Sequence, residues 1–304
     1  MNEQQENQKQ YKVEWSFSFE KLGDQIGDFF RSLGSPEEVE VKSATFTEAV
    51  GSATSARVRL DLSAGETNVY MLEGSDNLID ADLTYIGDIN FVVGGEAEKV
   101  VSLNQNTTPG EWFRHALTWL GKGHHHLTWK VGLTPNIPLE LDIHGGVGEC
   151  HFSLATLKPG KVSLNGGTGE FHVTLPRSSE LYSATLHGGV GELDVDIPAE
   201  ASVNLTIRAG TGEVNVDIGA GAVADITVHG GVGEVDIRIP QGAAVRVEGK
   251  AGIGDINVPA SFTRMSGSDE FLGKSGVWQS PNYGESTRKI NIRYSGGVGA
   301  LNVR

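Results

Sequence analysis

A short motif, Gly-Gly-x-Gly or Ala-Gly-x-Gly followed by an acid, recurs along the second half of this 304-residue chain. Successive copies are separated by 21, 22, 21, 21 and 21 residues, and a last copy, ending at Ala300, follows after 45. A fixed period of this length is typical of stacked repeats, which offer long flat faces rather than one deep pocket. The glycine and acid of the six copies are Gly148 and Glu149, Gly169 and Glu170, Gly191 and Glu192, Gly212 and Glu213, Gly233 and Glu234, and Gly254 and Asp255.

On both sides of the motif, apolar residues alternate with polar ones, as in strands that bury one face. The apolar positions are odd-numbered from Leu139 to Ile143 and even-numbered from Cys150 to Leu154. Such a change of parity requires one extra residue at a bulge or corner, where glycine supplies the unusual dihedral angles. We therefore expect an all-β fold, a single-stack β-solenoid resembling a β-helix, with the six glycine–acid pairs as its structural corners.

The units fall into two alternating classes. One class has valine in the middle of the motif and a histidine before it, namely His144, His187 and His229; the other has threonine or isoleucine there. One turn of the solenoid could hold two units on opposite sides, so that like residues stack about 4.8 Å apart. Alternatively, one turn holds one unit and like residues lie two rungs apart. We favour the first arrangement, which would divide the acids into two rows on opposite sides.

The period divides the chain into four parts. We expect residues 1–38 to form a polar tail and an amphipathic helix, 39–105 an N-terminal β domain, 106–138 a linker with a short helical excursion, and 139–304 the repeat array. The first helix would run from Leu22 to Leu33. We rank its roles as a cap on the open end of the stack first, a docking element second and a membrane-surface helix last, because its acids outnumber its bases.

Charge and composition exclude several classes of partner. The net charge of −15 repels phosphate, which makes nucleic acids and anionic membrane surfaces unlikely partners. No apolar run is long enough to span a membrane, and the polar N-terminus does not resemble a secretory signal. The single cysteine, Cys150, permits no internal disulfide. These features predict a cytoplasmic protein.

The array, with Trp278, Tyr283 and the closing unit from Ile290 to Val303, resembles the LiaF-type cell-wall-active antibiotic response domain. It is also similar to the related "putative adhesin" toast-rack domains. Residues 40–105 resemble the N-terminal domain of these proteins. The resemblance implies an all-β, solenoid-like fold, brings no catalytic residues and no cofactor, and suggests a role in envelope stress. LiaF-type proteins carry transmembrane helices before this domain and restrain a sensor kinase, whereas this sequence shows no such helices.

The repeated acids are the first candidate site. Like charges about 4–5 Å apart repel by about 1 kcal/mol in water, so a row of them would favour a bound cation. The alternative, which we favour, is that each carboxylate accepts hydrogen bonds at its corner and is otherwise solvated. Calcium would require more oxygen ligands than one carboxylate per unit supplies.

Histidines supply two further candidates. His124, His125 and His126 lie in a glycine-flanked loop, but adjacent residues point in different directions, so a zinc or nickel site there is the less favoured interpretation. His144, His187 and His229 could stack as a pH-sensitive ladder, although a structural ladder of neutral rings is favoured. Cys150 occupies an inward position and is expected to be inert.

We expect a non-enzymatic scaffold or interaction surface tied to envelope stress or adhesion, with a protein partner or a second copy bound to it. The alternative is a carbohydrate-active or carbohydrate-binding protein that uses acids on one face. A cleft that combined two acids with Trp278 or Tyr283 would favour that alternative. End-to-end self-assembly is a third possibility, because Ala300 and Arg304 would finish on an uncapped strand.

Overall fold

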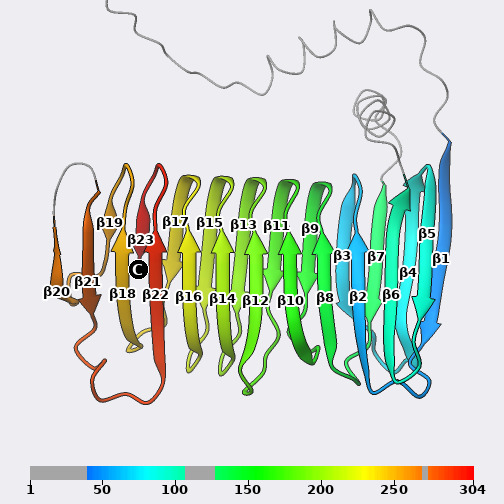
Figure 1. Cartoon of the computed structure of the whole chain (residues 1–304), viewed down its shortest axis with the longest axis horizontal. Helices are drawn as coiled ribbons and strands as arrows, with labels where there is room; N and C mark the ends of the chain where they lie inside the picture. The colour runs from blue at the N-terminus through cyan, green and yellow to red at the C-terminus, as the bar shows by residue number, and fades with distance from the viewer. Residues whose placement is uncertain (1–39, 107–126, 269–272) are drawn as a thin grey trace, which may run out of the picture. The chain divides into compact units, whose positions relative to one another are not determined.

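The computed structural model of the chain describes residues 40–106, 127–268 and 273–304, and every regular element in these residues is a β-strand. The strands form two sheets, A and B (Figure 1). The all-β prediction is thus confirmed for the described residues, and no membrane-spanning helix is found among them. The helix expected from Leu22 to Leu33 lies outside these ranges, and so does the part of the expected 106–138 excursion from 107 to 126.

Sheet A has 11 strands in the spatial order β1-β4-β7-β3-β9-β11-β13-β15-β17-β23-β19. Its strands are β1 (Val41–Ala49), β3 (Glu66–Met71), β4 (Asn77–Ile86), β7 (Thr128–Leu133), β9 (Val147–Ser153), β11 (Thr168–Thr174), β13 (Val190–Ile197), β15 (Thr211–Ile218), β17 (Val232–Arg238), β19 (Ile256–Asn257) and β23 (Leu301–Val303).

Sheet B has 12 strands in the spatial order β20-β21-β18-β22-β16-β14-β12-β10-β8-β2-β6-β5. Its strands are β2 (Ser55–Asp61), β5 (Asp88–Gly94), β6 (Glu98–Asn106), β8 (Leu139–His144), β10 (Pro159–Asn165), β12 (Tyr182–His187), β14 (Ser202–Arg208), β16 (Val223–His229), β18 (Ala244–Lys250), β20 (Thr263–Ser268), β21 (Ser275–Gln279) and β22 (Lys289–Ser295).

From β8 to β17 the chain alternates between the sheets, so each unit contributes one strand to sheet B and, after its glycine motif, one to sheet A. Consecutive units pair in parallel with like positions opposite: Glu170 of β11 faces Glu149 of β9 and Glu192 of β13. One turn of the chain therefore holds one unit. The prediction of two units per turn is wrong, because a single unit already supplies both strands and both connections.

The last unit does not lie at the end of the stack. Strand β22 pairs in parallel with both β16 and β18, and β23 pairs with both β17 and β19. The chain passes this position, forms β18 to β21, and returns to fill it. The outermost strands at this end are β19 and β20, so the expectation of an uncapped strand at Ala300 to Arg304 is wrong (Figure 1).

Antiparallel strands flank the parallel array at both ends. Strands β1, β4 and β5 are antiparallel to their neighbours on one side, and β21 is antiparallel to β18 and β20 on the other. Both sheets run without a break from β2 and β3 into the array, through the pairs β2–β8 and β3–β9. The corner at Gly65 and Glu66 joins β2 to β3 in register with the later corners. The division at residues 105 and 139 stays a prediction.

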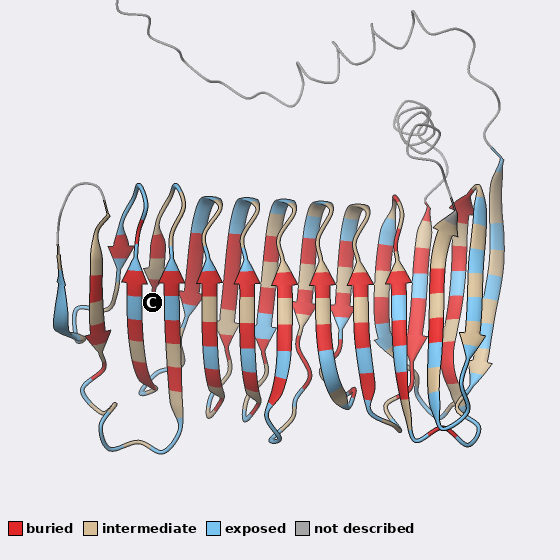
Figure 2. Ribbon diagram, viewed as in Figure 1, coloured by how far each residue is buried: buried red, intermediate tan, exposed pale blue. Residues whose placement is uncertain are grey.

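The core lies between the two sheets and consists of their inward side chains, which form alternating buried bands along the strands (Figure 2). Leu141 and Ile143 before the first regular corner are buried, and so are Cys150, Phe152 and Leu154 after it. The change of parity expected from the sequence therefore occurs at the glycine motif. The alternate residues of the same strands point outward, toward solvent.

Close backbone contact explains the glycines of the corner. Neighbouring corners continue the ladder, as in the bond from the Thr168 amide to the Gly146 carbonyl at 3.0 Å. A Cβ on Gly146 would lie 1.5 Å from the carbonyl oxygen of Ser63, a separation no side chain can adopt. Gly148 also has a φ of 136°, which L-residues rarely adopt. Glycine is therefore required at these positions of the motif because neighbouring units pack too closely for a side chain.

Candidate functional site

The outward residues of β9, β11, β13, β15 and β17 form one surface, which we call the acidic face. Its first row follows directly from the glycine corner and consists of glutamates that pair in register from strand to strand, about 4.8 Å apart. The row is Glu149, Glu170, Glu192, Glu213 and Glu234. All the corner acids of these strands therefore lie on one sheet, and the predicted division into two opposite rows is wrong.

Two further rows complete the acidic face. The second row is His151, His172, Asp194, Asn215 and Asp236, and the third is Ser153, Thr174, Asp196, Asp217 and Arg238. Arginines offset part of the charge at one end, where Arg238 lies 2.8 Å from Asp217 and Arg304 lies 3.2 Å from Asp236. The middle of the face, around β13, has the densest negative charge.

At the centre of the acidic face, the side-chain amide of Asn215 bridges two carboxylates. Asn215 is 9% exposed and donates to Glu192 Oε1 at 3.1 Å and to Asp194 Oδ1 at 3.0 Å. Nearby charge from Asp194 and partial burial raise the pKa of the Glu192 carboxyl, with smaller contributions from Glu213 and Glu170. The neighbouring acids thus disfavour the ionisation of Glu192, and a cationic partner would relieve this repulsion.

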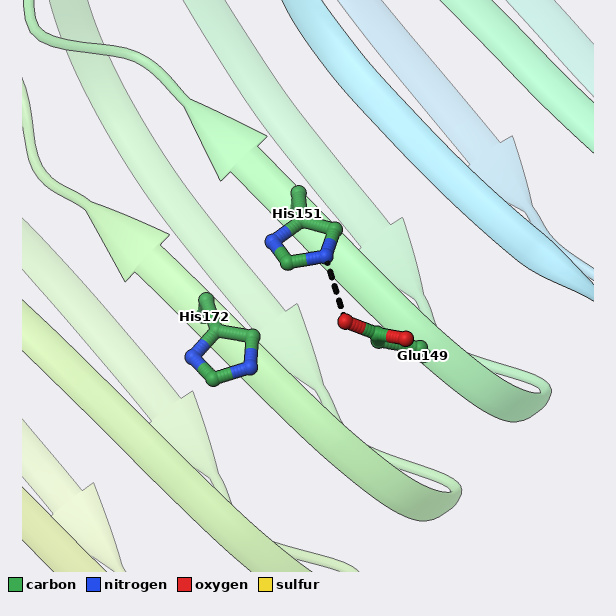
Figure 3. A group of neighbouring side chains, drawn as sticks. All are labelled: Glu149, His151 and His172. Atoms are coloured by element: carbon green, nitrogen blue, oxygen red, sulfur yellow. Dashed lines mark hydrogen bonds and ion pairs between the residues drawn. The ribbon is translucent and has the colours of Figure 1, made fainter.

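At the other end of the face, two histidines lie side by side on β9 and β11 (Figure 3). Their rings are stacked, with centroids 4.8 Å apart and an interplanar angle of 9°. His151 Nε2 lies 2.8 Å from Glu149 Oε1, and His172 Nδ1 lies 2.9 Å from Asp194 Oδ2. Among the described residues, this is the group of histidines and acids whose ligand atoms converge enough to hold a metal ion.

The sixth repeated acid, Asp255, lies near the end of the stack. It forms an ion pair with Lys274 at 3.2 Å, and Ala300, directly before β23, takes the place of an acid between Asp255 and Glu234. The row of like charges is therefore interrupted at β23. Cation binding along the row stays the less favoured hypothesis.

The predicted ladder of His144, His187 and His229 does not form. These histidines lie on the outer face of sheet B, but Asn165 pairs between the first two and Arg208 between the last two. The reason is that like residues recur on every second strand. Burial and the neighbouring Arg208, at 2.9 Å, lower the pKa of His187.

Cys150 is buried, as the alternation indicates, and burial raises the pKa of its thiol to about 11. A thiol held protonated in this way is a poor nucleophile and metal ligand. The three consecutive histidines, His124, His125 and His126, lie outside the described residues. Their proposed metal site stays a prediction.

Trp278 lies on β21 of sheet B and Tyr283 lies in the turn between β21 and β22, so both belong to the sheet B side rather than to the acidic face. Tyr283 donates to Asn291 at 2.7 Å and borders a cavity of about 260 Å³. The cavity contains one carboxylate, that of Glu248, between Arg246 and Arg293, and Trp278 does not line it. The pair of acids that glycoside chemistry requires is absent from this cavity.

Sequence reasoning missed His151 and His172. A signal was present, because the order acid, apolar residue, histidine occurs in two consecutive units and in none of the next four. The signal gains meaning only when consecutive units are known to pair directly. Under the two-unit turn that we favoured, the two side chains would lie on opposite sides of the molecule.

Two family models match the chain. The model of the N-terminal domain of toast-rack proteins covers residues 35–196, and the model of the C-terminal domain of LiaF, described as cell wall-active antibiotics response, covers residues 204–303. No curated protein matches the sequence at a significant level. The boundary between the two models falls inside the regular array, between β13 and β14.

Solved structures with similarity to the chain include two described as adhesion proteins. A crystal structure of a "putative cell adhesion protein" from Clostridium sporogenes is 17% identical, with a TM-score of 0.40, and the match covers 87% of this chain and 99% of that one. A "putative adhesin" from Bacteroides fragilis is 12% identical, with a TM-score of 0.36, and the match covers 89% and 100%.

Proposed function

This chain belongs to the toast-rack family, and we propose that it is a non-enzymatic β-solenoid scaffold in the response to cell-wall-active antibiotics. In this proposal it acts in the cytoplasm and binds a protein partner through the acidic face. The observation that carries the proposal is the row of five glutamates in register, backed by Asp194, Asp196 and Asp217.

A basic segment of another protein suits this surface. Strands in register place carboxylates at regular intervals of about 4.8 Å, so a lysine- or arginine-rich segment could pair with several of them at once. Association would be fast and sensitive to salt, because much of its energy comes from charge. A flat face with repeated groups is suited to binding a chain rather than a small molecule.

Binding to a lysine- and arginine-rich peptide tests the surface. We expect the triple variant Glu192→Gln, Glu213→Gln, Glu234→Gln to lose at least tenfold in affinity by isothermal titration calorimetry at low salt. The matched control, Glu140→Gln, Asp225→Asn, Glu248→Gln, removes the same charge from sheet B. Equal affinity in the two variants would contradict the proposed surface.

The cellular role is tested separately. In cells that lack the gene, the wild-type chain and the sheet B control should restore growth under a cell-wall-active antibiotic, whereas the acidic-face variant should not. Restoration by all three, or by none, argues against the role. Light scattering shows whether the partner is a second copy, since the mass would then exceed the 32.4 kDa of one chain.

A further inference from the structure

Three side chains at the β9–β11 end of the acidic face converge on one point. His151 and His172 are directly opposite each other in the parallel register, and Glu149 precedes His151 by two residues on the same face. One ligand atom from each of the three lies within 4.8 Å of the other two. The group is half-exposed, so an ion could reach it from solvent without any movement of the backbone.

A fourth side chain orients one of the histidines. Nδ1 of His172 lies 2.9 Å from Asp194 Oδ2, and the charge of that carboxylate favours the neutral tautomer that carries its hydrogen on Nδ1. Nε2 of His172 is then left with a free lone pair. Metal-binding histidines commonly have this arrangement, in which a carboxylate fixes the tautomer and the ring.

We propose that Glu149, His151 and His172 bind one divalent transition-metal ion, with Zn²⁺ as the reference ion. Around a tetrahedral zinc with bonds of about 2.1 Å, ligand atoms lie about 3.4 Å apart. The three ligand atoms lie within 4.8 Å of one another, so binding requires side-chain rotations that close this spacing to about 3.4 Å. Solvent supplies the fourth ligand.

The donor set decides the class of ion. Two imidazole nitrogens and one carboxylate oxygen suit Zn²⁺, Ni²⁺ or Cu²⁺, whereas Ca²⁺ and Mg²⁺ require six or more oxygens. When the ion binds, His151 gives up the Nε2 hydrogen directed at Glu149 Oε1 and takes the neutral tautomer with its hydrogen on Nδ1, and the carboxylate changes from hydrogen-bond acceptor to ligand. The bound ion then links β9 to β11.

The site is confined to this end of the acidic face. The next strands carry Asp194, Asn215 and Asp236 at the position of the histidines, so neighbouring units lack the nitrogen ligands. The adjacent glutamates Glu170 and Glu192 contribute a negative field that concentrates cations near the group. One ion per chain is therefore expected from the described residues.

Calorimetric titration of the full chain with ZnCl₂, after treatment with a chelator, tests the proposal. We expect micromolar binding at this site, an increase in Tm with Zn²⁺, and no comparable response to Ca²⁺. His172→Asn and His151→Asn should each weaken the binding at least tenfold, and both should fold normally because neither ring is buried. His187→Asn, on sheet B, is the matched control and should bind like the wild type.

The triple variant His124→Asn, His125→Asn, His126→Asn separates this site from the other candidate. Retention of the micromolar site in that variant, together with its loss in His172→Asn, supports the proposal. Loss of all zinc binding in the triple variant, unchanged affinity in His172→Asn, or no binding at millimolar Zn²⁺ would each overturn it.

Discussion

The glycine corner and the acidic face follow one another within every regular unit, yet they repeat for different physical reasons. The glycines that precede the acids pack against the backbone of the neighbouring unit with no room for a side chain. The glutamates directly after them point into solvent, next to like charges. Packing thus accounts for the repeated glycines but not for the repeated glutamates. This difference agrees with the proposal that the acids serve binding rather than folding.

Substitution of a corner glycine should give the largest effect. Gly212 has a φ of 135°, and an added Cβ would lie 1.8 Å from the carbonyl oxygen of Gly191. Strain and overpacking cost about 1–3 kcal/mol each, so Gly212→Ala should lower the free energy of unfolding by about 4 kcal/mol. Urea denaturation measures the change.

Two other glycines separate the causes. Gly242 has a φ of 74° but no atom within 4 Å of an added Cβ, so Gly242→Ala should cost only the strain, about 1–2 kcal/mol. Gly284 has neither feature, and Gly284→Ala should be nearly neutral. Similar losses in all three variants would show that close packing is not the reason for the corner glycines.

The centre of the acidic face should give an intermediate effect. Asn215→Asp replaces the amide that donates to Glu192 and Asp194 with a third carboxylate. Loss of two charge-assisted bonds and added repulsion should lower the free energy of unfolding by about 2 kcal/mol at neutral pH and low salt. Salt should recover part of the loss, because it screens the charges.

Asn165→Asp on sheet B is the matched control for this change. Asn165 pairs between His144 and His187, so an added negative charge there has imidazole rings instead of acids as its neighbours across the strands. We expect its effect on stability to be small. A loss as large as that of Asn215→Asp would mean that any new charge on either face is equally costly, and that the acidic face is not special.

The sequence predicts the corner and the two-faced strands because both depend on local spacing. Period, parity and glycine position fix where the chain turns and which side chains face inward, and Cys150 and Gly148 lie where the pattern places them. The neighbours along the stack depend on non-local pairing. That is why the two-unit turn, the His144 ladder and the open strand at Ala300 were wrong.

The same limit explains what the sequence showed of the candidate site. The acids were identified from their spacing, but the convergence of His151, His172 and Glu149 depends on which units are adjacent. The position of the last unit between β16–β17 and β18–β19 has no counterpart in a linear reading of the repeat. That the last unit lies between two earlier ones can be recognised only from the pairing of the strands.

The smallest expected effect has the opposite sign. Because the pKa of Glu192 is raised in the folded protein, the folded state holds this proton to higher pH than the unfolded chain does. The stability contribution of Glu192 therefore falls as pH rises from its ordinary pKa of 4.5 through the raised value, and at pH 7 its charge is a cost. Glu192→Gln should increase the free energy of unfolding at pH 7 by less than about 1 kcal/mol, since solvent screens surface charges.

The pH dependence distinguishes this gain from a general effect of glutamine. Below pH 4.5 the carboxyl is protonated in both states, so the gain should vanish there. Glu140→Gln is the control, because Glu140 pairs with Arg57 at 3.0 Å and its neutralisation should give no gain. A stabilising Glu192→Gln that also weakens binding of the basic peptide would show an acid kept at a cost to the fold. If Glu192→Gln instead lowers the free energy of unfolding, the acids, like the corner glycines, are required for folding.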